Sequence, residues 1–141
     1  MQGRYMAKCY GAFKVKFSDR ELEDDKVVNA LLFEWLPGLD LSKADPSEFN
    51  FRKRKEIRNT VLDIIKLVYQ KGVCFTTNID LGNFILVSNG HTPKIHGFEF
   101  TSSLQELDDA EGQDTPDEMV IRLQKSNIRN LEYLLNHIGF T

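Results

Sequence analysis

The sequence contains few cysteines and no long apolar run, and each absence excludes a class of protein. The two cysteines, Cys9 and Cys74, fit no metal-binding or redox spacing, so we expect buried free thiols rather than a disulfide. No apolar run approaches the ~20 residues that span a bilayer, and residues 1–17 lack the continuous apolar segment of a secretory signal. We therefore expect an intracellular protein, cytoplasmic by default, with no membrane partner.

A strong excess of positive charge is also absent. The chain has 18 Lys and Arg against 21 Asp and Glu, a net charge of −3, so it has no general attraction for nucleic acid. Basic residues do gather in "RKRKEIR", Arg52 to Arg58, where a phosphate contact or a nuclear import signal competes with a solvated helix face. Acidic residues gather in residues 105–116, which we expect to form a solvated loop.

What the sequence does contain is the composition of one globular domain. With 141 residues, of which 41% are hydrophobic, the chain is long enough for a single core. Residues 13–17 alternate apolar side chains with lysine, which predicts an outer strand with one face on that core. Residues 27–35 are richer in apolar side chains and predict a second, more deeply buried strand, paired antiparallel with the first.

Two helices are indicated farther along the chain. The stretch "DPSE" predicts a helix that begins near Pro46, with a possible break near Asn50, and Gly72 ends its continuation. Five residues share the apolar face of this helix: Ile57, Val61, Ile64, Ile65 and Val68. The aromatic residues Phe49 and Phe51 are expected to anchor its start against the sheet. A closing helix is predicted over residues 116–137, with Thr115 and Glu118 as a capping box. Its apolar stripe comprises residues at helical spacing: Ile128, Leu131, Leu135 and Ile138.

Between the helices the sequence predicts a hairpin. "NFILV" is a short buried strand, "SNG" is a turn in which Asn89 and Gly90 tolerate positive φ, and "KIHGF" is a returning strand. Together these elements predict an α+β fold in which a small antiparallel sheet packs on a helical body.

The order of these elements, and several of their residues, resemble the middle of a protein kinase. "CYGAF" and "NALLFEWLPGLDL" are similar to the fourth and fifth strands leading into the hinge, with Phe33 as gatekeeper and Glu34, Trp35 and Leu36 as the hinge. "VYQKGVCFTTNIDLGNFILV" resembles the end of the long C-lobe helix and the catalytic loop. "PKIHGFEF" resembles the "PKIIDFG" that ends in the metal-binding aspartate. The resemblance covers about residues 5–100.

This resemblance implies a truncated protein kinase-like domain that occupies the whole chain. Residues 1–38 would be the strand hairpin and hinge-like segment, and residues 39–104 the helical body with its catalytic-loop-like hairpin. The acidic loop at 105–116 and the C-terminal helix at 117–141 would follow. The resemblance also implies nucleotide contacts at four kinase-equivalent positions: Phe33, Glu34, Leu36 and Asn83.

The sequence departs from the kinase pattern where the chemistry is done. Asn78 and Gly97 occupy the positions of the catalytic and metal-binding aspartates, and an amide or a glycine supplies neither a base nor a carboxylate. Aligning the loop on Gly72 instead places Thr77 at the first position, which is no better. The glycine-rich loop and the phosphate-pairing lysine have no counterpart in this sequence. We therefore expect no catalytic residues.

Other groups could in principle replace the lost acids. Asp80, Asn83 and Glu99 are weak candidates for a metal site, although Asp80 is more simply a cap of its loop, and strand alternation should turn Glu99 away from the Gly97 face. We expect His96 to be a packed, hydrogen-bonded core histidine and His91 to lie in a turn.

These expectations predict a catalytically inactive kinase-like domain, a pseudokinase, that acts as a protein-interaction or regulatory module. Its partner would be another protein, such as a kinase or a kinase substrate, and self-association is possible through an unpaired edge or apolar patch at residues 30–35. A decayed gene fragment that still folds is a further possibility. The alternative function is an atypical kinase or nucleotide-binding protein that retains ATP binding with magnesium. The inactive module would need no cofactor.

Overall fold

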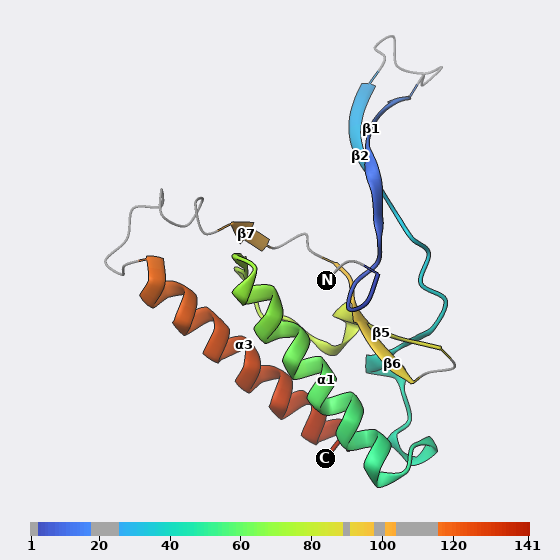
Figure 1. Cartoon of the computed structure of the whole chain (residues 1–141), viewed down its shortest axis with the longest axis vertical. Coiled ribbons are helices and arrows are strands. Elements are labelled where there is room, and N and C mark those ends of the chain that lie inside the picture. Colours follow the sequence, from blue (N-terminus) through green and yellow to red (C-terminus); the bar gives the residue numbers. More distant parts are fainter. Residues whose placement is uncertain (1–2, 18–25, 89–90, 98–100, 104–115) are drawn as a thin grey trace.

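The structure is a computed structural model that describes residues 3–17, 26–88, 91–97, 101–103 and 116–141 (Figure 1). It is an α+β fold with small antiparallel sheets beside two helices, as the sequence predicts. The predicted acidic loop, the cap Thr115 and the turn residues Asn89 and Gly90 lie outside the described residues. No helix in the described part of the chain is both long and apolar enough to cross a bilayer.

The core lies where the two helices meet. Helix α1 spans Phe51–Gln70 and helix α3 spans Pro116–Ile138, and the two lie side by side (Figure 1). All five residues of the predicted apolar face of α1 are buried. On α3, Leu131 and Leu135 are buried, and Phe140 follows the helix into the same core. Both helices are therefore confirmed, and each apolar stripe packs as its spacing predicts.

The start of α1 follows its sequence signals closely. A single turn of 3-10 helix, η2 (Pro46–Glu48), precedes a break, and the side chain of Asn50 then caps α1 by accepting from the Lys53 backbone N–H at 2.9 Å. Phe49 is buried, as an anchor should be, but it packs on Phe140 after α3 rather than on a strand of the sheet, and Phe51 is exposed, so the predicted anchoring by Phe51 is wrong. At the other end Gly72 adopts φ 78°, the left-handed conformation that ends a helix.

Two small sheets connect the helices. Strands β3 (Leu39–Asp40), β5 (Phe84–Val87) and β6 (Thr92–Ile95) form one antiparallel sheet in the order β3-β5-β6. Strands β4 (Val73–Phe75) and β7 (Thr101–Ser103) form the other. The predicted hairpin is confirmed, but its returning strand ends at Ile95, so His96 and Gly97 lie beyond the ladder. The positive φ in its turn belongs to Ser88 among the described residues.

The remaining short elements join these sheets to the body. The 3-10 turns η1 (Leu41–Lys43) and η3 (Leu81–Asn83) bring the buried residues Leu41 and Leu81 into the core. Gly38 leads into β3 against the backbone of β5, where a Cβ atom would overlap the carbonyl oxygen of Leu86. Glycine is therefore required there by close approach of two backbones, and not by a positive φ.

Strands β1 (Cys9–Phe17) and β2 (Lys26–Phe33) form an antiparallel hairpin, here called the arm, that projects away from the helical body (Figure 1). The pairing is as predicted, but the burial is not. Eight apolar side chains of the arm are 37–63% exposed: Tyr10, Phe13, Val15, Val27, Val28, Leu31, Leu32 and Phe33. The expected core contact of the first strand and deep burial of the second are therefore wrong, because no described element forms a second layer over the arm.

The cysteines differ in their surroundings. Both are free thiols, which confirms the absence of a disulfide. Cys74 is fully buried in β4, whereas Cys9, at the start of the arm, is only partly buried, so the predicted burial is confirmed for Cys74 alone.

Candidate functional site

An apolar pocket of about 600 Å³ lies at the base of the arm. Its walls come from the end of β2 and the segment after it, from β5 and β6, and from the N-terminal segment. The lining residues are Met6, Ala7, Leu31, Phe33, Glu34, Trp35, Leu36, Ile85, Ile95, His96 and Gly97. Its size is that of an ordinary small-molecule site. A second hollow, of about 490 Å³, is lined by α3 residues and contains none of the predicted site residues.

The structure brings together some of the predicted site residues and separates others. Phe33, Glu34 and Leu36, expected to contact a nucleotide, line the apolar pocket together with Gly97. Asn83 does not line it, although its side chain lies close to Gly97. Asn78 is exposed in the segment before η3. Glu99 lies outside the described residues, so its place as a metal candidate stays a prediction.

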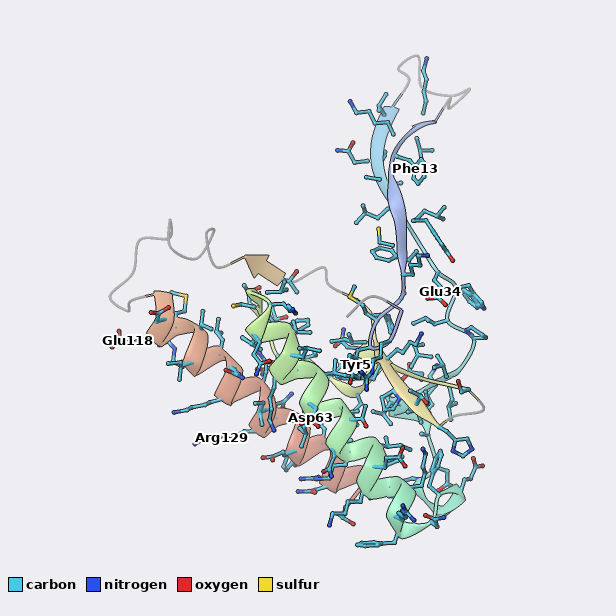
Figure 2. The ribbon with its side chains drawn as sticks, viewed as in Figure 1. Tyr5, Phe13, Glu34, Asp63, Glu118 and Arg129 are labelled. Carbon is cyan, nitrogen blue, oxygen red and sulfur yellow. The ribbon has the colours of Figure 1, made fainter. Side chains whose placement is uncertain are left out.

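The N-terminal segment forms a wall of the pocket that sequence reasoning missed. Met6 bridges Ile95 in parallel, and the Ile95 N–H donates to the Tyr5 carbonyl at 2.8 Å. The ammonium group of Lys94 donates to the Gly3 carbonyl at 2.8 Å. Figure 2 shows Tyr5 beside the strands of the body and Glu34 at the base of the arm. Nothing in the short sequence before β1 indicates this pairing, because it depends on contacts about ninety residues apart in the chain.

Glu34 is the acidic residue of the pocket wall, and its carboxylate has a structural role. The backbone N–H of Glu34 donates to the Lys8 carbonyl at 2.7 Å, and its Oε2 accepts from the Lys8 backbone N–H at 3.1 Å. The residue thus closes the base of the arm with a reciprocal pair of bonds. A carboxylate held this way fixes where the chain leaves β2 and turns toward Trp35 and Leu36.

His96 contributes an imidazole to the pocket wall. Its backbone N–H donates to the Asn83 carbonyl at 2.8 Å, whereas its side-chain Nε2 is buried and has no hydrogen-bond partner among the described residues. The predicted packed histidine is therefore right for the packing and for the main chain, but not for the side-chain bond. His91 lies in a turn as predicted, with its ring edge-to-face on Phe49 at 6.1 Å between centroids.

The loop that resembles a catalytic loop is held by its own side chains. Asp80 caps η3, with Oδ1 accepting from the Gly82 N–H at 2.6 Å. Asn83 Oδ1 accepts from the Asp80 N–H at 3.1 Å, and Asn83 Nδ2 donates to the carbonyls of His96 and Gly97 at 3.5 and 3.4 Å. The expectation that Asp80 caps its loop is confirmed. Both ends of the Asn83 amide therefore hold the loop in place.

Within the described ranges, no three His, Cys, Asp or Glu side chains lie close enough to hold a metal ion together. The pocket wall combines apolar side chains with one carboxylate and one imidazole. Such a wall can cover a flat apolar group. Binding a triphosphate with its cations requires several oxygen ligands or basic groups, and this wall does not supply them.

Two asparagines of α3, which sequence reasoning missed, hydrogen-bond the backbone of the segment that leads into η3. Asn127 is 1% exposed, and its Oδ1 accepts from the Ile79 N–H at 2.8 Å while its Nδ2 donates to the Tyr69 hydroxyl at 2.9 Å. Asn130 Nδ2 donates to the Ile79 carbonyl at 2.7 Å. The backbone between Asn78 and Asp80 is thereby tied to α3. The spacing of two asparagines three apart on one helix was the available signal, although it is a weak one.

Burial also shifts the pKa of two titratable groups near these hydrogen bonds. Desolvation raises the pKa of the Tyr69 phenol, and the hydrogen bond that the phenol oxygen accepts from Asn127 opposes that rise. Burial likewise raises the pKa of the Cys74 thiol, so this cysteine is not an activated nucleophile.

The basic stretch at the start of α1 is only partly a solvated face. Arg54 donates to the Phe49 carbonyl at 3.1 Å, and Arg58 donates to Asn136 Oδ1 at 2.6 Å and to the Phe140 carbonyl at 3.3 Å. These two arginines satisfy carbonyl groups where the chain enters α1 and leaves α3. Arg52 and Lys55 are exposed, as the simpler interpretation predicts.

Comparison with models of known protein families and with curated proteins gives no match for this sequence. The pocket, the loop and the arm are therefore the features that bear on function.

Proposed function

We propose that this chain is a catalytically inactive, protein kinase-like module that works inside the cell by binding another protein, such as a kinase or a kinase substrate, through its arm. The observation that carries this proposal is the exposure of the arm. Phe13, Val28 and Leu32 are each about half exposed on a hairpin that projects from the body (Figure 2). Apolar side chains gathered in this way are typical of a surface that another protein covers.

Energetics supports the same proposal. An isolated two-stranded hairpin is at best marginally stable in water, and it needs further strands or a packed layer to be stable. The arm is such a hairpin, and within the described residues its strands pack chiefly on each other. A partner that covers it would remove apolar side chains from water at roughly 25 cal/mol per Å². Binding would therefore stabilise the arm at the same time as it forms the complex.

The loop geometry supports the absence of phosphoryl transfer. Asn78 offers an exposed amide where a kinase needs a base, and Gly97 offers no carboxylate. The side-chain amide of Asn83 hydrogen-bonds the carbonyls of His96 and Gly97 and so holds the loop in place. The free cysteines are consistent with a reducing compartment.

A photo-crosslinking experiment tests the binding function. A photoreactive phenylalanine analogue replaces Phe13 on the arm in one variant and the exposed Tyr133 on α3 in a matched control. We expect illumination in cell extract to give a discrete product from position 13 that is lost when Val28→Asp is added. Equal products from both positions, or none from position 13, would contradict the proposal.

Nucleotide binding is the second candidate function, because Phe33, Glu34 and Leu36 do line one pocket together with Gly97. A thermal-shift titration separates it from the first, since a ligand that binds the native state raises the melting temperature. A rise with ATP that requires magnesium and is lost in Asn83→Ala would favour nucleotide binding. A rise with adenosine alone, unchanged by magnesium, would show that only the apolar pocket is occupied.

A further inference from the structure

The apolar pocket at the base of the arm has one acidic group on its described wall and no lysine or arginine. Apart from Glu34 and the imidazole of His96, its lining side chains are apolar. Glu34 is half-buried, and its Oε2 accepts from the Lys8 backbone N–H at 3.1 Å, whereas its Oε1 has no hydrogen-bond partner among the described residues. A hydrogen bond from a neutral amide does not cancel the charge of a carboxylate. The wall therefore combines apolar surface with one negative group.

The basic residues nearest to this wall in the sequence do not neutralise Glu34. In the part of the chain that the structure describes, none of them forms an ion pair with it. Their positive groups instead lie on an aromatic ring or donate to a carbonyl: Arg4 on Tyr5 at 4.8 Å, Lys8 on Tyr10 at 5.8 Å and Lys94 on Gly3 at 2.8 Å. Residues 98–100, which follow Gly97 outside the described ranges, include one acid and no basic residue. The carboxylate is thus available to a positive group of a ligand.

Two aromatic rings accompany this carboxylate. Phe33 and Trp35 flank Glu34 in the sequence, and all three residues line the pocket. The Trp35 side chain is 84% exposed and Phe33 is 42% exposed, so both rings offer surface to a ligand. The face of an aromatic ring attracts an organic cation, and tryptophan does so most strongly. A carboxylate between two aromatic residues is therefore suited to recognise a positive nitrogen.

We propose that this pocket binds a small organic cation, an amine or a quaternary ammonium compound with an aromatic or other apolar body. The body would lie against the apolar wall, and the positive nitrogen would lie at Glu34 and the neighbouring rings. The pocket volume of about 600 Å³ lies in the range of ordinary small-molecule sites. This inference does not rest on the proposed function, because a partner on the arm need not enter the pocket.

The sign of the charge separates this ligand from a nucleotide. An alkylamine has a pKa close to that of lysine, so it is positive at neutral pH. A nucleotide is negative there, as is the carboxylate of Glu34, and the described wall has no lysine or arginine for its phosphates. We expect the apolar body to supply most of the affinity. The half-buried carboxylate then supplies a selectivity of about three- to tenfold, as is typical of partly exposed charge pairs and cation–ring contacts.

Fluorescence of Trp35 tests the proposal directly, because this residue is the single tryptophan of the sequence. The probes are biphenylpropylamine, biphenylpropanol and biphenylpropanoate, which share one apolar body and differ in the charge of the end group. We expect the amine to shift the Trp35 emission to shorter wavelength, because it covers an exposed indole. It should bind at least threefold more tightly than the alcohol and at least tenfold more tightly than the carboxylate.

Two variants show whether Glu34 causes this preference. Glu34→Gln removes the charge but keeps an oxygen that can accept from the Lys8 N–H. It should reduce the preference for the amine over the alcohol to less than twofold. Asp63→Asn is the matched control, because it removes one negative charge from an exposed position on α1, away from the base of the arm (Figure 2). It should leave the preference unchanged.

Several results would overturn the inference. They are equal affinities for the amine and the alcohol, an unchanged preference in Glu34→Gln, and an equal loss of preference in Asp63→Asn. Binding that raises the melting temperature without shifting the Trp35 emission would also overturn it, by placing the ligand elsewhere. The comparison of the three probes needs no variant, so it decides the matter even if Glu34→Gln does not fold. Crosslinking at position 13 and binding of the amine can each fail without the other, which keeps this inference separate from the proposed function.

Discussion

At the scale of single residues, Asn127 is the polar residue that the described part of the chain buries in its core. Its amide joins α3 to the Ile79 N–H and to the Tyr69 hydroxyl. Removing it would leave a buried backbone donor without a partner, which costs more than the lost bond itself. We expect Asn127→Ala to lower the free energy of unfolding by about 1–3 kcal/mol in chemical denaturation.

The neighbouring Asn130 provides the control for that measurement. It bonds the Ile79 carbonyl but is only partly buried, so water can replace its amide. Asn130→Ala should therefore cost less than Asn127→Ala. Equal costs would show that burial of the Asn127 amide is not what matters.

Tyr69 gives a prediction for alkaline pH. Its phenol has a raised pKa in the folded chain because burial disfavours the phenolate. Above about pH 10, the ordinary value for tyrosine, the unfolded chain loses this proton before the folded chain does. The free energy of unfolding should therefore fall as pH rises from about 10, and denaturation at a series of pH values measures it.

The control for the pH series must include Cys74, whose thiol also has a raised pKa through burial. A Tyr69→Phe chain should lose part of the alkaline decline, and Cys74→Ala should remove a part that begins at lower pH, because thiols titrate before phenols. A decline that is identical in all three chains would show that neither group causes it.

These residues also show the limit of inference from sequence. An asparagine within a helix usually faces water, and only the docking of a loop from Ile79 onto α3 buries Asn127. That docking joins residues 48 positions apart, and no local pattern encodes it. The break near Asn50 and the helix end at Gly72, in contrast, were predicted, because such signals depend on the few residues around each helix end.

At the scale of elements, the same distinction separates the helices from the arm. The apolar stripes of α1 and α3 predict both the helices and the faces that they bury, since each stripe has the other as its partner. The alternation in β1 predicts a strand equally well. It does not say whether a second layer is present to cover the strand, and for the arm no described element supplies one. Prediction of burial failed there for this reason.

The candidate site likewise combines residues that are close in the sequence with residues that only distant contacts bring to it. Phe33, Glu34 and Leu36 are consecutive or nearly so and lie in one wall of the apolar pocket, while their contacts to a nucleotide stay a prediction. Met6 and Ala7 complete that pocket because the N-terminal segment pairs with β6, a contact that the sequence before β1 does not indicate. Asn83 was expected beside the nucleotide, but the capping geometry of η3 turns its amide toward Asp80, His96 and Gly97.

The difference between arm and body predicts how one substitution acts in two elements. Leu31 on the arm is 63% exposed, whereas Leu131 on α3 is 0% exposed. Leu131→Ala should cost about 2–5 kcal/mol of unfolding free energy, because it removes buried atoms and leaves a cavity. Leu31→Ala should change it by less than about 0.5 kcal/mol. Thermal or chemical denaturation of the two variants checks this, and a large cost for Leu31→Ala would show that the arm is packed in solution.

At the scale of the whole molecule, the chain combines a body with a core and an arm without one. A single cluster of buried residues draws on α1, α3, β5 and β6, and it contains no residue from either strand of the arm. Stability within the described residues is therefore unevenly distributed. Such a distribution leaves the arm free to adapt to a partner while the body keeps its shape.

Hydrogen exchange measures this distribution directly. Amides of the arm should exchange with an opening free energy of no more than about 2 kcal/mol, because unpacked two-stranded hairpins open easily. Amides in the middle of α1 and α3 should exchange only through global unfolding and share one higher value. Destabilising the core with Leu131→Ala should then lower protection in both helices and leave the arm unchanged. If protection in the arm falls together with that of the helices, the arm and the body unfold as one unit, and the surface offered to a partner is already packed.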